Sequence, residues 1–196
     1  VWNLTNQDVL TIRVHPGANS ITSIAFSPDG KTVFTGADEK FVRQWDSVTG
    51  QEIRSFSSDG IEIYSVAVSP DGNLLAASHQ DGNIQLWDVK TGEKLRTLTG
   101  HAGLVLRITF NNDGSLLASA SFDRLAKVWD VATGKELTSL YGNASNVFGV
   151  SFSPEGNQLA TAGADGTVRL YTLQMNELVA LARSRLTRSL TIEECQ

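Results

Sequence analysis

The stretch Leu116–Lys135, LLASASFDRLAKVWDVATGK, decides how the chain folds. The apolar run at 116–120 predicts a strand, and residues 126–129 predict a second strand with Lys127 on its polar side. A tight turn separates the two strands, and the polar segment at 132–135 predicts a further turn. The signals within this stretch are therefore all of β type.

Close relatives of this stretch recur along the chain at one fixed spacing. An aromatic residue returns every 42 residues, at Trp45, Trp87, Trp129 and Tyr171. The same spacing relates four acidic-glycine pairs, which begin at Asp29, Asp71, Asp113 and Glu155. A register kept at several positions marks one structural unit copied in tandem.

Each copy carries signals for four short strands. The first full copy begins with an alternating apolar strand that contains Ile24 and Phe26 and passes through an acidic-glycine turn into a second strand. The strand with the aromatic residue comes third, and a fourth strand with Ile53 and Phe56 follows the Thr-Gly turn. Four short antiparallel strands per copy predict the blades of a β-propeller, an all-β fold.

Composition excludes several classes of protein. The chain has 196 residues, of which 41% are hydrophobic and 19% are charged, and this is enough apolar material for a packed core. Its formal charge of −5 gives no basic field for nucleic acid or an acidic membrane. The single cysteine, Cys195, and the lack of a secretory or membrane-spanning pattern lead us to expect a cytoplasmic protein.

Several dipeptides resemble the motifs of one repeat family. Trp45-Asp46, Trp87-Asp88 and Trp129-Asp130, together with Gly100-His101, are similar to the signatures of WD (WD40-type) repeats. The resemblance implies blades around a central channel, with the first strand of each blade lining it. The other copies lack Gly-His, so we expect them to lose part of the family's hydrogen-bond network without losing the sheet.

The repeats divide the chain into six expected parts. These are the second half of a truncated blade at 1–16, blades at 17–58, 59–100 and 101–142, a last blade at 143–173, and a helical tail at 174–196. About four and a half blades are too few for the ring that this family usually forms, so we expect an open arc or a fragment of a larger propeller. The alternative is a four-bladed ring in which Val9–Val14 pairs with Val168–Tyr171.

The tail breaks the repeat pattern. Residues 173–188 place apolar side chains at helical spacing, which predicts a short C-terminal helix. In the alternative alignment, 177–182 is the outer strand of the last blade. The tail also resembles those that close WD-repeat regions of large bacterial multidomain signalling proteins, in which a nucleotide-switch or protease-like module precedes the propeller.

The third full copy contains a serine, a histidine and an aspartate that a catalytic interpretation could use. His101, Ser119, Asp123 and Trp129 resemble the structural tetrad of WD repeats, in which the turn aspartate accepts from the histidine and the serine and indole extend the chain of bonds. A hydrolase would need an exposed nucleophile and an oxyanion hole, and the sequence has no nucleophile elbow. We expect a structural role for this tetrad and no catalytic residue.

Other chemistry finds little support in the sequence. The histidines at 15, 79 and 101 lack zinc spacing, no calcium loop is present, and the glycines sit in turns and not in a phosphate-binding loop. We therefore expect neither a metal nor a cofactor. Two sequons, at Asn3 and Asn143, are expected to be coincidental because no secretory signal precedes them.

The predicted function is a non-enzymatic scaffold or sensor module that binds a protein or peptide on the propeller face. We expect this module to be the WD-repeat part of a longer bacterial multidomain signalling protein. On the family's geometry, eight residues line the lip of the channel: Thr22, Tyr64, Leu106 and Phe148, and the residues before the turn acid, Asp38, Gln80, Phe122 and Ala164. The expected binding residues are Tyr64, Gln80, Leu106, Phe122 and Phe148, although Tyr64, Leu106 and Phe148 alternatively pack between blades. The alternative function is a hydrolase or lyase with a site in the channel. Open blade edges predict self-association.

Overall fold

The computed structural model describes residues 11, 20–38, 40–59 and 61–173. These residues form fifteen strands and no helix. The strands are β1 (Ile21–Phe26), β2 (Thr32–Ala37), β3 (Phe41–Asp46), β4 (Glu52–Ser57), β5 (Ile63–Val68), β6 (Leu74–His79), β7 (Ile84–Asp88), β8 (Lys94–Leu98), β9 (Val105–Phe110), β10 (Leu116–Ser121), β11 (Ala126–Asp130), β12 (Glu136–Leu140), β13 (Val147–Phe152), β14 (Gln158–Gly163) and β15 (Val168–Thr172).

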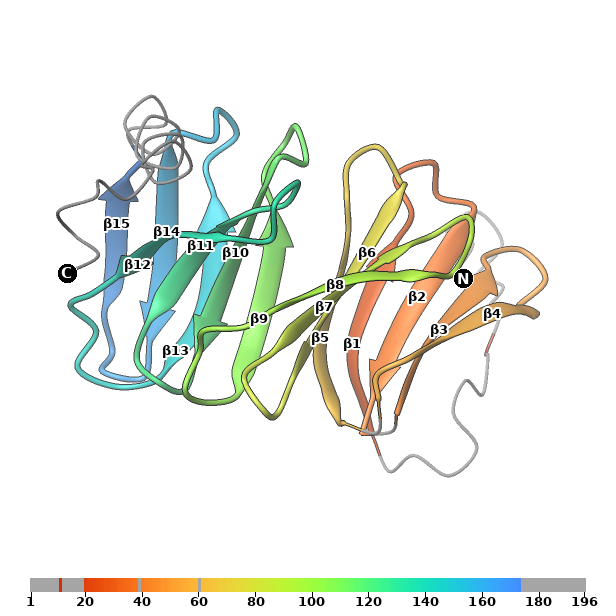
Figure 1. The fold of residues 1–196 in the computed structure, drawn as a ribbon, viewed down its shortest axis with the longest axis horizontal. Helices are drawn as coiled ribbons and strands as arrows, with labels where there is room; N and C mark the ends of the chain where they lie inside the picture. The colour runs from red at the N-terminus through yellow and green to blue at the C-terminus, as the bar shows by residue number, and fades with distance from the viewer. Residues whose placement is uncertain (1–10, 12–19, 39, 60, 174–196) are drawn as a thin grey trace, which may run out of the picture.

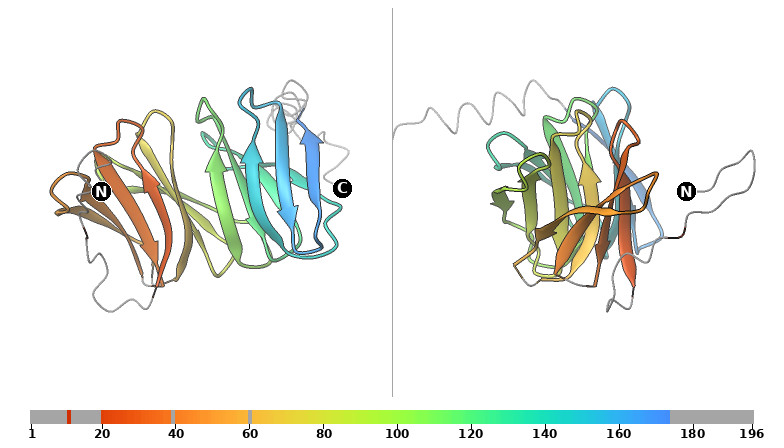
Figure 2. Two further views of the ribbon diagram at one scale, coloured as in Figure 1. Left: turned by 180° about the vertical axis from the view of Figure 1, so that it is seen from behind. Right: turned by 90° about the vertical axis from the view of Figure 1, so that its right-hand side faces the viewer.

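The strands form four antiparallel sheets, each built from consecutive strands. We call them the first blade (β1–β4), the second (β5–β8), the third (β9–β12) and the last (β13–β15). The blades stand side by side in an arc, with the first and last at opposite ends (Figures 1 and 2). This confirms the predicted all-β fold of unclosed propeller blades. The predicted C-terminal helix, and the half blade predicted at 1–16 apart from residue 11, lie outside the described residues.

Tight turns join the strands because glycine occupies the positions that need a positive φ. In the third blade, Gly114 follows Asp113 with a φ of 74°. The Asp113 carboxylate accepts from the backbone N–H of Ser115 at 2.8 Å, and this bond closes the turn between β9 and β10. The acidic-glycine pair in the sequence therefore marks a turn that uses the carboxylate as a hydrogen-bond acceptor and the glycine for its positive φ.

A β-bulge lies near the start of the first strand of every blade. In the third blade, Val105 pairs with Ser121 and Arg107 pairs with Ala120, so Leu106 has no partner. Bulges at the same place in the other blades leave Thr22, Tyr64 and Phe148 as the extra residues. A bulge re-aims a side chain. The four extra residues are those predicted for one row of the channel lip.

Neighbouring blades meet along seams of apolar side chains. At the seam between the first two blades, Phe34 and Val42 pack in one cluster with Trp87. Between the first strands of these two blades, the Ser23 hydroxyl accepts from the backbone N–H of Val66 at 3.0 Å and joins β1 to β5. Burial of each large apolar side chain stabilises the fold by about 1.5–3 kcal/mol, so the seams hold the blades together.

Candidate functional site

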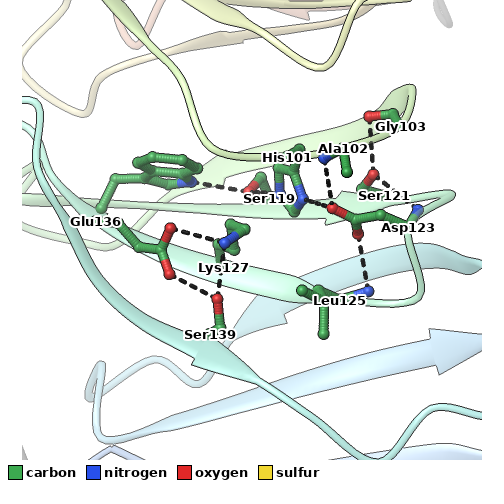
Figure 3. A network of polar contacts seen from close by, with 11 residues as sticks. His101, Ala102, Gly103, Ser119, Ser121, Asp123, Leu125, Lys127, Glu136 and Ser139 are labelled. Carbon is green, nitrogen blue, oxygen red and sulfur yellow. Dashed lines mark hydrogen bonds and ion pairs between the residues drawn. The ribbon is translucent and has the colours of Figure 1, made fainter.

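A chain of four polar side chains crosses the third blade (Figure 3). His101 Nδ1 lies 2.7 Å from Asp123 Oδ2, and Nε2 lies 2.7 Å from Ser119 Oγ. The indole N–H of Trp129 donates to the same Oγ at 2.8 Å. Because an ionised carboxylate only accepts, Nδ1 must donate, and Nε2 is left to accept the serine hydroxyl. The structure thus brings the four predicted tetrad residues into one chain of hydrogen bonds.

The Asp123 carboxylate anchors this chain at the turn between β10 and β11. It accepts from the backbone N–H groups of Ala102 and Leu125, each at 3.0 Å, as well as from His101. Burial raises the pKa of Asp123, but the hydrogen bonds from His101 and the two backbone groups outweigh burial and lower the pKa from 3.8 to about 2. The ionised carboxylate is therefore a built-in acceptor for three donors.

The order of acid, histidine and serine resembles a nucleophilic triad, but the serine is inaccessible. The Ser119 side chain is completely buried, and its oxygen already accepts the Trp129 indole N–H. A nucleophile needs room for a substrate carbonyl beside it. The geometry therefore fits a network that fixes the blade, as buried polar groups do when every donor finds an acceptor.

The described residues at the equivalent positions of the other blades repeat parts of this network. In the last blade, Asp165 accepts from the Ala144 N–H at 2.9 Å, just as Asp123 does from Ala102, while Tyr171 donates to the Tyr141 carbonyl at 2.9 Å. In the first blade, the Trp45 indole donates to Thr35 at 2.8 Å. The first, second and last blades still form their sheets. The full chain of bonds is therefore not required for a blade to fold.

The second blade replaces the histidine of the tetrad with Asp59. Asp59 accepts from Gln85 Nε2 at 3.0 Å and forms an ion pair with Lys94. Its φ of 56° is in the left-handed region, which costs a residue other than glycine about 1 kcal/mol. The loop before β5 is therefore held by this charged pair where the third blade uses a histidine.

His79 is an unexpected feature of the second blade. The side chain is completely buried, and neither ring nitrogen has a hydrogen-bond partner among the residues that the structure describes. Burial lowers the pKa of His79 below 6.5, although the Asp81 and Asp59 carboxylates oppose this shift. Because the equivalent residue of the third blade is Ser121, the repeat pattern gives no sign of a buried imidazole here. The folded state therefore favours a neutral ring.

We expect the burial of His79 to make stability depend on pH. The unfolded chain binds a proton at this residue near pH 6.5 and the folded chain does so only at lower pH, so the free energy of unfolding should fall as the pH drops below 6.5. Urea unfolding measured at several pH values should show this decline in the wild type. His79→Leu should remove part of it and leave stability at neutral pH unchanged or higher, because two unpaired nitrogens are lost. An unchanged pH profile in the variant would contradict the assignment.

Lys127 corrects one expectation from the sequence. The sequence pattern predicts it on the polar side of its strand, yet it is buried and donates to Glu136 Oε2 at 2.7 Å and to Ser139 Oγ at 2.8 Å (Figure 3). Burial raises the pKa of Glu136, and the hydrogen bond from Lys127 reverses the shift, so that the pKa is lowered. The Lys127 side chain on β11 therefore lies against Glu136 and Ser139 of β12 and not in open solvent.

An exposed aromatic pair lies at the lip, where the third and last blades meet. The rings of Phe122 and Phe148 are 6.0 Å apart at an angle of 58°, and 41% and 46% of their surfaces remain exposed. The predicted neighbour of Phe122 is Leu106, which is half-buried at its bulge. The sequence does not predict the aromatic pair because the pair joins two blades, whereas the repeat pattern describes each blade alone.

The remaining lip residues carry different chemistry. In the second blade, the Tyr64 hydroxyl donates to Glu62 at 3.3 Å, and the half-buried Tyr64 lies near the exposed Gln80 at the same end of the β5–β6 pair. Arg107 and Arg124 are exposed on the third blade. The lip therefore has an acidic and hydroxylated part over the second blade and an aromatic part with exposed arginines on the third.

The described residues contain no candidate metal site. Among them, no group of three or more His, Cys, Asp or Glu lies close enough to hold a metal ion. None of them belongs to a helix long and apolar enough to cross a membrane. Asn143 of the second sequon is buried and accepts from Arg169 at 3.1 Å, so a glycan cannot be attached to it in the folded blade. The sequon at Asn3 lies outside the described residues.

Comparison with known proteins connects these blades to a repeat family. A family model described as "WD domain, G-beta repeat" (WD40) matches residues 6–46, 50–88, 92–130 and 134–172. The match at 50–88 begins with β4, which pairs with β3, and continues through β5–β7 of the second blade. Each of the three later repeats therefore completes the blade before its own and ties neighbouring blades together through the backbone.

Two solved structures are similar to this chain. "Structure of U3-55K" is 27% identical with a TM-score of 0.76, and "Crystal structure of RRP9 WD40 repeats" is 28% identical with a TM-score of 0.76. Both similarities cover 84% of this chain and 51% of the other, so this chain spans about half the length of those structures. No curated protein matches it in sequence. Since the family model covers most of the sequence and the blades have the fold of these WD40 structures, the chain belongs to the WD40 repeat family.

Proposed function

We propose that this chain is a protein-interaction module whose lip binds a protein or peptide, serving as a scaffold or sensor within a larger cytoplasmic signalling assembly. The observation that carries the proposal is the exposed pair formed by Phe122 and Phe148. Large aromatic side chains dominate the energetics of protein interfaces, and rigid blades hold them in place without an ordering cost.

The charges around the lip favour a particular ligand. Arg107 and Arg124 are exposed on the blade that carries Phe122, and neither forms an ion pair among the described residues. A peptide with an apolar side chain next to a carboxylate would use both the aromatic pair and an arginine. Glu62 would repel such a carboxylate from the lip of the second blade.

None of the described residues is placed to carry the alternative enzymatic function. Ser119 is buried inside the third blade, and the exposed lip residues include neither a histidine nor a cysteine among the described part of the chain. WD40 proteins are in general interaction scaffolds. We therefore propose binding without catalysis.

A peptide-display selection on the immobilised chain tests the ligand class. Selected peptides should combine an apolar residue with Asp or Glu, and Phe122→Ala or Phe148→Ala should weaken binding of a selected peptide by about 1–3 kcal/mol. Either substitution should change the free energy of unfolding by less than about 1 kcal/mol, because both rings are partly exposed. Affinity is measured by fluorescence anisotropy and stability by a thermal melt.

Val48→Ala is the matched control, since Val48 is an exposed apolar residue in the turn between β3 and β4, away from the lip. It should alter neither property. If the selected peptides bind Phe122→Ala and Phe148→Ala as tightly as the wild type, the lip is not the binding site. A large fall in melting temperature for Phe122→Ala would instead identify this ring as part of the core.

A further inference from the structure

The three seams within the arc join the same two surfaces. We call the side of a blade that faces the next blade its exit face, and the side that faces the preceding blade its entry face. In the first seam, Val42 on the exit face and Val66 on the entry face belong to one apolar cluster. In the second seam, Ile84 and Leu86 cluster in the same way with Ile108. Exit and entry faces of this chain are therefore complementary to each other.

The exit face of the last blade has no covering blade among the described residues. Val168 and Leu170 on β15 are 72% and 70% exposed. The residues at the same positions of the second and third blades are at most 1% exposed: Ile84, Leu86, Ala126 and Val128. The last sheet also has only three strands in the described part of the chain, so β15 forms its edge. Exposed apolar residues at an edge of this kind mark an association surface.

The entry face of the first blade is open in a matching way. Ile24 and Phe26 on β1 are 64% and 57% exposed. The residues equivalent to Ile24 in the later blades are Val66, Ile108 and Val150, and each is at most 8% exposed. These two open faces lie at opposite ends of the arc (Figures 1 and 2).

We propose that the open exit face of one chain binds the open entry face of a second copy, so that two copies close head to tail into one ring. The internal seams show that this pair of surfaces packs well, and the exposed valine, leucine, isoleucine and phenylalanine of the two open faces carry no charge that would oppose contact. Two equivalent seams related by a two-fold axis satisfy both open faces at once and leave no free end. Because the chain covers 51% of each similar structure, two copies supply the length of one of them.

Two double variants test this arrangement on the 196-residue chain. The exit variant carries Val168→Glu and Leu170→Glu, and the entry variant carries Ile24→Glu and Phe26→Glu. These side chains are largely exposed, so the blades should keep their circular dichroism spectra. Val48→Glu, at an exposed apolar residue on neither face, is the control. Sedimentation equilibrium gives the mass of each sample.

Head-to-tail pairing gives a distinctive set of masses. The wild type and the control should have twice the 21.2 kDa mass of the chain. Each double variant alone should remain a monomer, because every possible pair then includes one charged face in each seam. A mixture of the two variants should form a dimer again, because the intact entry face of the exit variant meets the intact exit face of the entry variant.

Every other outcome overturns the proposal. A monomeric wild type means that the faces bind something else, such as further blades on another segment. If either variant alone forms dimers, like faces pair with each other or another surface forms the dimer. If the mixture stays monomeric, an unchanged exit face does not bind an unchanged entry face. If a variant loses its folded spectrum, disulfide formation replaces this test: in a Cys195→Ser background, chains with Ile24→Cys should cross-link to chains with Val168→Cys, and failure to cross-link contradicts the ring.

Discussion

Replacement of Trp129 by alanine should lower the free energy of unfolding by about 3–5 kcal/mol, a larger loss than we expect from any substitution at the lip or in a turn. The indole is 1% exposed and packs at the seam with Ile108 and Leu117. Its ring also meets the His101 imidazole at a centroid distance of 5.9 Å in an edge-on arrangement. Alanine would remove these contacts and leave a cavity that the rigid strands cannot fill. Urea unfolding followed by circular dichroism measures the loss.

Trp129→Phe separates packing from hydrogen bonding. Phenylalanine keeps most of the ring volume but lacks the N–H that donates to Ser119 at 2.8 Å. Its cost should be about 1–2 kcal/mol, well below that of alanine, because only one hydrogen bond and a small volume are lost. Equal losses of unfolding free energy for the two variants would show that Trp129 stabilises the fold through its hydrogen bond to Ser119 and not through its packing at the seam. A neutral alanine variant would contradict both roles.

The 42-residue register predicts the all-β fold well because each strand has a local signal. The strands expected at 116–120 and 126–129 correspond to β10 (Leu116–Ser121) and β11 (Ala126–Asp130). The alternation of apolar side chains and the turn glycines are both properties of short stretches, which a single sequence displays directly. The all-β fold follows from these stretches without knowledge of any contact between blades.

Contacts between blades are harder to predict for a physical reason. Phe122 and Phe148 meet across a seam, and their distance depends on how far one blade is rotated from the next. The bulge at Leu106 changes which side chains face the lip, yet the sequence contains no glycine or proline that marks it. The burial of Lys127 is missed because its partners, Glu136 and Ser139, come from the adjacent strand.

The second large effect is expected at the other end of the tetrad. Asp123→Ala should destabilise the fold by about 2–4 kcal/mol, because it leaves His101 and the backbone N–H groups of Ala102 and Leu125 without their acceptor. His101→Ala should cost less, about 1–3 kcal/mol, since the carboxylate keeps both backbone donors. Thermal and urea unfolding of the two variants measure this order.

Asp81→Ala is the matched control because Asp81 occupies the same position in the second blade. There the histidine is replaced by Asp59. Asp81 is exposed and, among the described residues, accepts from Asn83 alone, at 3.0 Å from its backbone N–H and 2.6 Å from its side chain. Loss of this local pair should cost less than about 1 kcal/mol. A similar loss for Asp81→Ala and Asp123→Ala would show that the turn, and not the tetrad, accounts for the stability.

Acid unfolding gives an independent test of the same carboxylate. The pKa of Asp123 is lowered from 3.8 to about 2 in the folded chain, so its contribution to stability is complete above pH 3.8 and is lost as the pH falls toward 2. Asp123→Asn cannot titrate, and the fall in its free energy of unfolding over this window should be shallower than that of the wild type. An identical slope in both proteins would mean that Asp123 is not held ionised by the tetrad.

If His101→Ala instead left stability intact and abolished a hydrolytic activity of the wild type, the tetrad would be an active site, and the buried position of Ser119 would have to open to admit a substrate.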